Sequence, residues 1–316
     1  MRKLILIFSF IFMLIGCGGG GGSQGNVERA FKLKIDTSKD TGTSFTIQKR
    51  QPYTYDYNIE CGDGSPKVEG ITGDYTCTYA NDGIYTITIT GKYPAIKFDK
   101  PKMVIDVVQW GTQVWESFRS AFEGCKNLVQ FSATDTPNLS KVKSMRDTFI
   151  YCYNFNANIN NWDVSNVENM SGMFASCHKF NQPLDKWDVS NVVNMDAMFS
   201  SNFVFNQNIN NWVVDNVTDM GYMFYAAHNF DKPFNKWHVN KVKWMHRMFN
   251  MAYKFNQDIS GWNVGNVTNM DNMFEEAKAF SNHDLSSWDV SNVKTHKDFC
   301  KNWGSNNTPP GRWSCP

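Results

Sequence analysis

The 316-residue sequence lacks a strong excess of charge of either sign. It holds 31 lysine and arginine residues against 30 aspartate and glutamate residues. Loss of Arg2 and Lys3 with an N-terminal leader would bring the mature chain to a net charge near −1. A strongly basic face is the electrostatic requirement for binding nucleic acid, so we expect no nucleic-acid partner.

Sequence motifs of common catalytic sites are also missing. The mature chain has no G-x-S-x-G, no H-E-x-x-H and no glycine-rich phosphate loop. No C-x-x-C pair or histidine cluster indicates a metal. His178 and His228 share one position of a repeat, but they lie two coils apart, roughly 10 Å at the spacing of a sheet. We therefore expect no enzyme, no metal and no cofactor.

No apolar run is long enough to span a bilayer comfortably. Arg2 and Lys3 precede twelve residues, 4–15, that are apolar except Ser9, which is the layout of a signal peptide. The run ends in Leu-Ile-Gly-Cys17, which resembles the lipobox of bacterial lipoproteins. The resemblance implies a signal peptide at 1–16 and a lipidated Cys17, with an ordinary secretory signal as the alternative.

A glycine-rich segment follows Cys17 and completes a tether at 17–30. Glycine-rich linkers behave as flexible coils, so this one would lift the folded part away from the lipid. Acyl chains on Cys17 would hold the protein to a membrane. Gly18, by resemblance to lipoproteins of Gram-negative bacteria, favours the outer membrane and the cell surface.

Five consecutive 25-residue units occupy residues 155–279. Each opens with phenylalanine, carries tryptophan seven residues later and closes on Met-x-x-Met-Phe. A fixed period of this length with an apolar skeleton is typical of a solenoid, in which neighbouring coils cover one another. A sixth unit, with Trp288, extends the array to residue 299. The tryptophans of the five units are Trp162, Trp187, Trp212, Trp237 and Trp262.

Within one unit the apolar period changes halfway. Trp162 and Val164 alternate with polar residues, which predicts a short strand. Residues 167–177 then place apolar side chains at three- and four-residue steps, which predicts a short helix. Asn166 stands at the expected N-cap, where it could cap the helix or bond along the stack. The predicted fold is an α/β repeat solenoid with a curved parallel sheet and short helices.

The repeat resembles that of BspA-like bacterial surface proteins, a branch of the leucine-rich-repeat group. The likeness rests on the skeleton F-N-x-x-I-x-x-W-x-V-x-N-V-x-x-M-x-x-M-F, which covers about half of the chain. The resemblance implies a surface-exposed or secreted protein, and for some members of the group binding to host proteins.

The array is flanked by three further predicted parts. Residues 31–101 alternate in the manner of strands and resemble a PKD-like β-sandwich, through Cys61-Gly-Asp-Gly-Ser and the run from Tyr79 to Ile89. Residues 102–154 read as degenerate N-terminal capping repeats, and 300–316 as a C-terminal cap. The end of a solenoid has an apolar face without a partner coil, so such caps are expected beside the repeats at 155–299.

Seven cysteines remain after Cys17, and their spacing separates them into two classes. Cys61 and Cys77 lie in the β-module, and Cys300 and Cys315 flank the C-terminal cap, so both pairs are candidate disulfides. The other three each follow the phenylalanine that ends an apolar stripe, where later units carry alanine. We expect these three to be buried free thiols: Cys125, Cys152 and Cys177.

The tryptophans share one face of the predicted strand with constantly apolar neighbours, so we assign that face to the interior. An exposed tryptophan platform for sugars or bases is the alternative. The residue that follows each tryptophan projects outward and differs from unit to unit, which a scaffold would not require. These candidate partner-binding residues are Asp163, Asp188, Val213, His238, Asn263 and Asp289.

Three functions remain open for this outward row. Adjacent Asp163 and Asp188 repel each other unless a cation or a basic partner group lies between them. The expected function is binding of a protein or glycan partner, with adhesion as its use. One alternative is a glycan hydrolase that uses these two carboxylates, and another is a purely structural protein of the cell envelope with a solvated surface.

Overall fold

The computed structural model of the chain describes residues 28–311 and 313–315. The predicted signal peptide, the lipidation site Cys17 and the glycine run of the tether lie outside the described residues. Within the described part no helix is long and apolar enough to cross a membrane.

The N-terminal module is built from antiparallel sheets. One sheet has five strands in the order β4-β3-β6-β1-β7, and β2 pairs with β5 in a second, two-stranded sheet. Single 3-10 turns, η1 (Thr37–Lys39) and η2 (Pro101–Met103), connect the strands. The strands are β1 (Phe31–Asp36), β2 (Ser44–Ile47), β3 (Asp56–Glu60), β4 (Val68–Ile71), β5 (Tyr75–Thr78), β6 (Ile84–Lys92) and β7 (Val104–Gln109).

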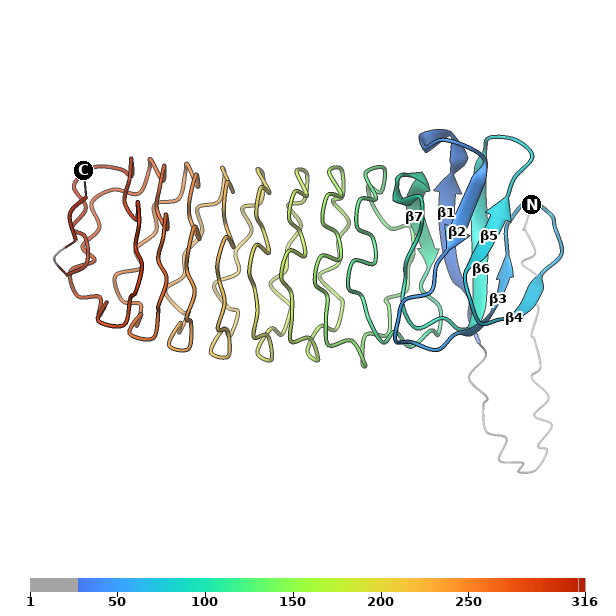
Figure 1. The fold of residues 1–316 in the computed structure, drawn as a ribbon, viewed down its shortest axis with the longest axis horizontal. Coiled ribbons are helices and arrows are strands. Elements are labelled where there is room, and N and C mark those ends of the chain that lie inside the picture. Colours follow the sequence, from blue (N-terminus) through green and yellow to red (C-terminus); the bar gives the residue numbers. More distant parts are fainter. Residues whose placement is uncertain (1–27, 312, 316) are drawn as a thin grey trace, which may run out of the picture.

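β1 lies inside the five-stranded sheet, and its pairing with β7 connects this module to the rest of the molecule. Phe31, Leu33 and Ile35 are buried, whereas the lysines between them are partly exposed. β1 pairs with β6 on one side and with β7 on the other. β7 immediately precedes the first coil, so the five-stranded sheet leads directly into the stack (Figure 1).

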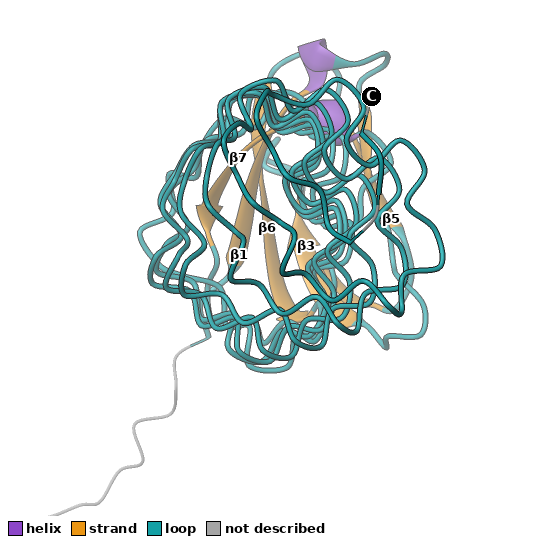
Figure 2. Cartoon of the chain, turned by 90° about the vertical axis from the view of Figure 1, so that its left-hand side faces the viewer, coloured by secondary structure: helices purple, strands orange, loops and turns teal. Residues whose placement is uncertain are grey.

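The repeating units form a row of similar coils along the long axis of the molecule (Figure 1). Seen along that axis the coils overlay one another, and they are drawn almost entirely as loops and turns (Figure 2). Single parallel bridges connect neighbouring coils at equivalent positions. They join Ser144 to Asn169, Asn169 to Asn194, Asn194 to Asp219, Asp219 to Trp244, Trp244 to Asn269 and Asn269 to Thr295.

The predicted α/β solenoid with a curved parallel sheet and short helices is wrong. Among residues 28–311 and 313–315 the helices are η1 and η2 alone, and both sheets are antiparallel. The expected strand at Trp162 is a turn, because the Trp162 N–H donates to the Ile159 carbonyl. The chain from residue 110 onward is therefore a stack of turns with isolated bridges, not a helix-and-strand repeat.

Two residues with positive φ prevent the predicted helix at 167–177. Gly172 has φ 62° and Ser176 has φ 58°, values in the left-handed region that a right-handed helix excludes. Their N–H groups donate to the next coil instead, at 2.8 Å to the Asp196 and Ser200 carbonyls. The N–H groups of the residues that follow them, Met173 and Cys177, donate to the carbonyls three residues earlier and close turns. Three-residue steps are common to a helix stripe and to consecutive turns, so the apolar period could not separate the two.

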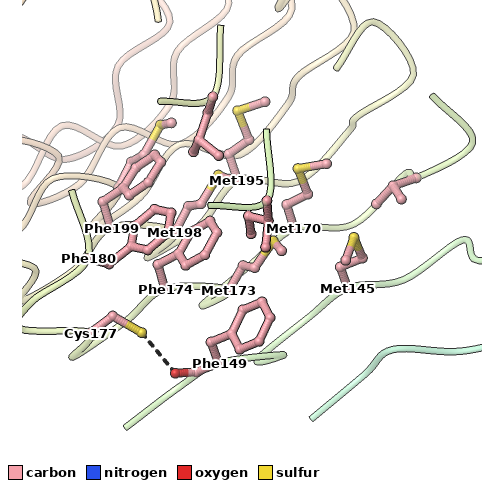
Figure 3. Packing of buried hydrophobic residues seen from close by; sticks show 14 of the residues in the cluster. Met145, Phe149, Met170, Met173, Phe174, Cys177, Phe180, Met195, Met198 and Phe199 are labelled. Atoms are coloured by element: carbon pink, nitrogen blue, oxygen red, sulfur yellow. Dashed lines mark hydrogen bonds between the residues drawn. The ribbon is translucent and has the colours of Figure 1, made fainter. Parts of the chain in front are cut away.

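Phenylalanine rings form the centre of the stack. Phe149, Phe174 and Phe199 follow one another with ring centroids 5.8 and 5.7 Å apart and nearly parallel planes. Phe180 packs against Phe174 with centroids 4.1 Å apart. The methionines fill the space around these rings (Figure 3). Such repeated offset stacking contributes roughly 0.5–1.5 kcal/mol per pair beyond the burial of area, which favours registry between coils.

The tryptophans are buried and connect one coil to the one before it. All six of the repeats are between 2% and 6% exposed. The indole of Trp212 donates to the Leu184 carbonyl at 2.9 Å, and Trp187 and Trp237 make the same bond to isoleucine carbonyls. Trp262 differs, because its indole N–H is buried without a partner among the described residues.

Asparagine does not cap a helix at the predicted position, since no helix forms there. It bonds along the stack instead, as the alternative interpretation predicted. The Asn191 side chain donates to the Ser165 carbonyl and Asn216 donates to the Ser190 carbonyl, both at 2.8 Å. Where lysine replaces asparagine, Lys241 Nζ reaches Asn216 Oδ1 at 2.7 Å.

Both predicted cysteine pairs are closed as disulfides. Cys61 is bonded to Cys77 in the β-module, and Cys300 is bonded to Cys315 at the C-terminal end. The remaining three thiols, Cys125, Cys152 and Cys177, are free and buried. Cys177 Sγ donates to the Phe149 carbonyl of the preceding coil at 2.9 Å (Figure 3), and Cys152 bonds to Phe122 in the same way.

Candidate functional site

The outward row occupies the surface that the sequence assigned to it. Its six residues are all exposed, whereas the flanking tryptophans are buried. An exposed tryptophan platform is therefore excluded for the repeats. The row lies on turns and not on the strands of a parallel sheet, which corrects the geometry expected for it. Its members are Asp163, Asp188, Val213, His238, Asn263 and Asp289.

Four members of the row have a local structural task. Asp188 Oδ1 accepts the N–H of Ser190 at 3.0 Å, and Asp163, Asn263 and Asp289 likewise each accept the N–H of the residue two positions later. These bonds are Asx turns, which fix the backbone on the outer side of each coil. Capping of its own turn is therefore sufficient to explain an aspartate at these positions.

Asp188, in the neighbouring pair Asp163 and Asp188, does not have the protonated state of a general acid. Hydrogen bonds from the Ser190 side chain and N–H lower the pKa of Asp188, so this carboxyl stays ionised at neutral pH. A glycoside hydrolase needs one carboxyl that remains protonated as the general acid. No group of three or more histidine, cysteine, aspartate or glutamate side chains suited to a metal occurs in the described part of the chain.

The centre of the row is different. Val213 has no side-chain acceptor with which to cap its turn, and it is 51% exposed. In the next coil His238 Nδ1 lies 3.4 Å from Asp215 Oδ1. A hollow of about 290 Å³ opens here between Asp215, His238, Asn240 and Lys241. An exposed valine beside charged groups and a hollow is a surface suited to contact with another molecule.

A larger hollow lies where the β-module meets the first coils. Its volume is about 600 Å³, within the range of small-ligand sites. Four basic side chains, two carboxylates and two tyrosines line it. Sequence reasoning missed this site because its residues come from the β2–β3 connection, the segment after β6 and two separate coils. They include Arg50, Lys97, Arg119, Lys126, Asp99, Glu123, Tyr151 and Tyr153.

A ladder of rings runs from this hollow along the surface of the stack. Tyr153, His178, Phe203, His228 and Tyr253 stack in sequence with centroids 4.6–4.8 Å apart. Lysine ammonium groups cover the two end rings at 4.9 and 5.6 Å. Burial lowers the pKa of both histidines, so they are neutral rungs at pH 7. Their shared position in the repeat therefore serves stacking.

Asp196 is a further group that the sequence did not single out. Burial, and then the nearby charge of Asp219, raise the pKa of Asp196 to about 6. A Cβ on Gly221 would lie 3.0 Å from Asp196 Oδ1 and would overlap the ring of His246. This glycine therefore leaves space between the carboxyl and the imidazole, which belong to the coils on either side of it.

Together these features define a repeat protein in which a stack of turn-rich coils continues from an antiparallel β-module. The chain belongs to the family described as "Mycoplasma protein of unknown function, DUF285". That family matches residues 116–230 and 203–313, so the two matches together span more than half of the chain. No curated protein and no solved structure matches the chain.

Proposed function

We propose that the chain is a lipid-anchored cell-surface protein whose stack of coils binds a partner protein through the outward row. The observation that carries this proposal is a contrast within each coil. Tryptophan and valine are buried and repeated, while the residue between them is exposed and changes its chemistry from coil to coil. Exposed positions contribute little to stability, so the folded stack leaves the chemistry of this row free to serve binding.

The contact is expected to centre on Val213 and His238. Interfaces draw most of their energy from a few central residues surrounded by polar groups. Val213 is the apolar member of the row, and the hollow beside His238 would receive a partner side chain. Asp188 and Asn263, on either side, are held by their own turns, and they would form a preorganised polar rim.

The proposed anchor is the lipidated Cys17. With the glycine-rich tether it would keep the stack clear of the membrane while leaving it free to reorient. Labelling of growing cells with radioactive palmitate tests this part directly. Label is expected in the wild-type chain and not in Cys17→Ser, and equal labelling of both would contradict the anchor.

The row is tested with the double variant Val213→Asn and His238→Asn in the full-length chain. Asparagine occupies the equivalent site at Asn263, where it caps its turn, so both substitutions suit the local backbone. We expect capture of partner proteins from host-matrix and bacterial-surface extracts to fall at least about tenfold, the loss of one central contact, with the melting temperature unchanged.

The matched control is Lys254→Gln, an exposed residue outside the row. It should leave capture unaltered. Undiminished capture by the double variant would contradict a role for the row. Loss of folding in the double variant would instead show that Val213 and His238 support the structure.

A further inference from the structure

We infer that the hollow between the β-module and the first coils binds an acidic sugar, a hydroxylated ring bearing one carboxylate. This site is separate from the outward row and does not depend on it. The inference rests on the charges, the unpaired donor and the aromatic surface of the hollow.

The hollow carries an excess of positive charge that the chain does not neutralise. Four cationic side chains line it against two carboxylates, Asp99 and Glu123. The described part of the chain contains nine ion pairs, and none of them involves these four cations. Uncompensated cations around a concave surface raise the local concentration of anions. The cations are Arg50, Lys97, Arg119 and Lys126.

Arg50 provides the fixed donor of the site. Its backbone N–H donates to Tyr55 Oη at 2.8 Å, and its carbonyl accepts the Tyr53 N–H at 3.1 Å. The side-chain Nε is buried and has no acceptor among the described residues. A buried donor without a partner costs free energy, and a guanidinium fork matches the two oxygens of a carboxylate. A carboxylate bound in the hollow would therefore pair with this guanidinium.

Lys126 adds a second positioned charge. Its Nζ lies 4.9 Å from the centre of the Tyr153 ring, and such a cation–π contact restrains the long side chain. The other face of the Tyr153 ring is covered by His178. Tyr151 is 46% exposed, so its ring is the one in the hollow that remains open to stack on a ligand.

The mixture of groups favours a sugar over other anions. An acidic peptide would bring several carboxylates towards Asp99 and Glu123, which would repel them. Inorganic phosphate would use the cations but not the tyrosine. In a ring with one carboxylate and several hydroxyls, the carboxylate pairs with the cations and the hydroxyls donate to Asp99 and Glu123. The flat face of the ring packs on Tyr151. The volume of about 600 Å³ is sufficient for such a ligand.

Titration calorimetry on the purified full-length chain tests the assignment, with glucuronic acid as the probe and glucose as its neutral match. We expect saturable binding of glucuronic acid that weakens with added salt, and at least about tenfold weaker binding of glucose. Arg119→Gln should raise the dissociation constant of glucuronic acid about tenfold. Tyr151→Ser should raise it about three- to tenfold, and serine occupies the equivalent positive-φ position at Ser176 and Ser201.

Lys254→Gln, an exposed cation outside the hollow, is the control and should bind as the wild type does. Melting curves establish that each variant is folded. Equal affinity for glucose and glucuronic acid would overturn the inference, as would unchanged affinity in folded Arg119→Gln and Tyr151→Ser. Tighter binding of inorganic phosphate or of a glutamate-rich peptide would reassign the hollow to a simple anion or to an acidic protein segment.

Discussion

Replacement of Asp196 by asparagine should stabilise the protein at neutral pH. The pKa of Asp196 is raised from its ordinary value of 3.8 to about 6, first by burial and then by Asp219. The folded chain therefore binds this proton more tightly than the unfolded chain does. The stability gained from the protonated carboxyl is full below pH 3.8, and it is lost as the pH rises through about 6.

The size of the effect follows from the shift. Two pKa units correspond to about 3 kcal/mol at about 1.36 kcal/mol per unit. Asp196 is partly open to solvent, which screens the charge, so we expect about 1–2 kcal/mol. For a chain of this size that corresponds to a rise in melting temperature of about 1.5–3 °C.

Thermal melting of wild type and Asp196→Asn at pH 7.5 and pH 4 measures this difference. The variant should melt higher at pH 7.5, and the two curves should nearly coincide at pH 4. Asp188→Asn is the matched control, because the pKa of Asp188 is lowered and Asn263 makes the same cap elsewhere. An unchanged melting temperature at pH 7.5 for Asp196→Asn, or a lower one at both pH values, would refute the argument.

Three further predictions concern the stack. Trp212→Phe should lower the free energy of unfolding, measured with urea, by at least about 1 kcal/mol more than Trp262→Phe does. Trp212→Phe leaves the Leu184 carbonyl without its donor, whereas Trp262→Phe removes an N–H that has no partner among the described residues. Equal losses in the two variants would contradict this. Iodoacetamide should modify none of the three free thiols in the folded chain and all three in denaturant. All three thiols are buried, and burial raises the pKa of Cys125 and Cys177. Rapid labelling of these thiols in the native chain would contradict this. His178 and His228 have pKa values lowered by burial, so their neutral forms stabilise the fold above pH 6.5 and this contribution is lost as the pH falls below 6.5. Phenylalanine already occupies the equivalent position at Phe203, so both histidines can be replaced by phenylalanine. The double variant should lose less melting temperature than the wild type between pH 7.5 and pH 5. An unaltered loss would exclude the two histidines as the acid-sensitive groups.

The candidate sites divide by how far apart their residues lie. The outward row could be located from the sequence, because one buried tryptophan and one buried or partly buried valine in each unit orient the residue between them. The hollow between the β-module and the first coils could not, since Arg50 and Tyr151 are 101 positions apart. Their approach depends on how the β-module is seated on the first coils, which no local pattern encodes.

The sequence by itself determined the 25-residue period, the side chains that are buried and the cysteines that pair. Each of these follows from recurrence or from short separations along the chain. Only the tertiary structure decided between helix and turns. The apolar steps of residues 167–177 suit both, and the choice rests on backbone bonds such as that from Gly172 to Asp196 in the next coil. A coil without its neighbours would lack those acceptors, so its conformation is a property of the stack.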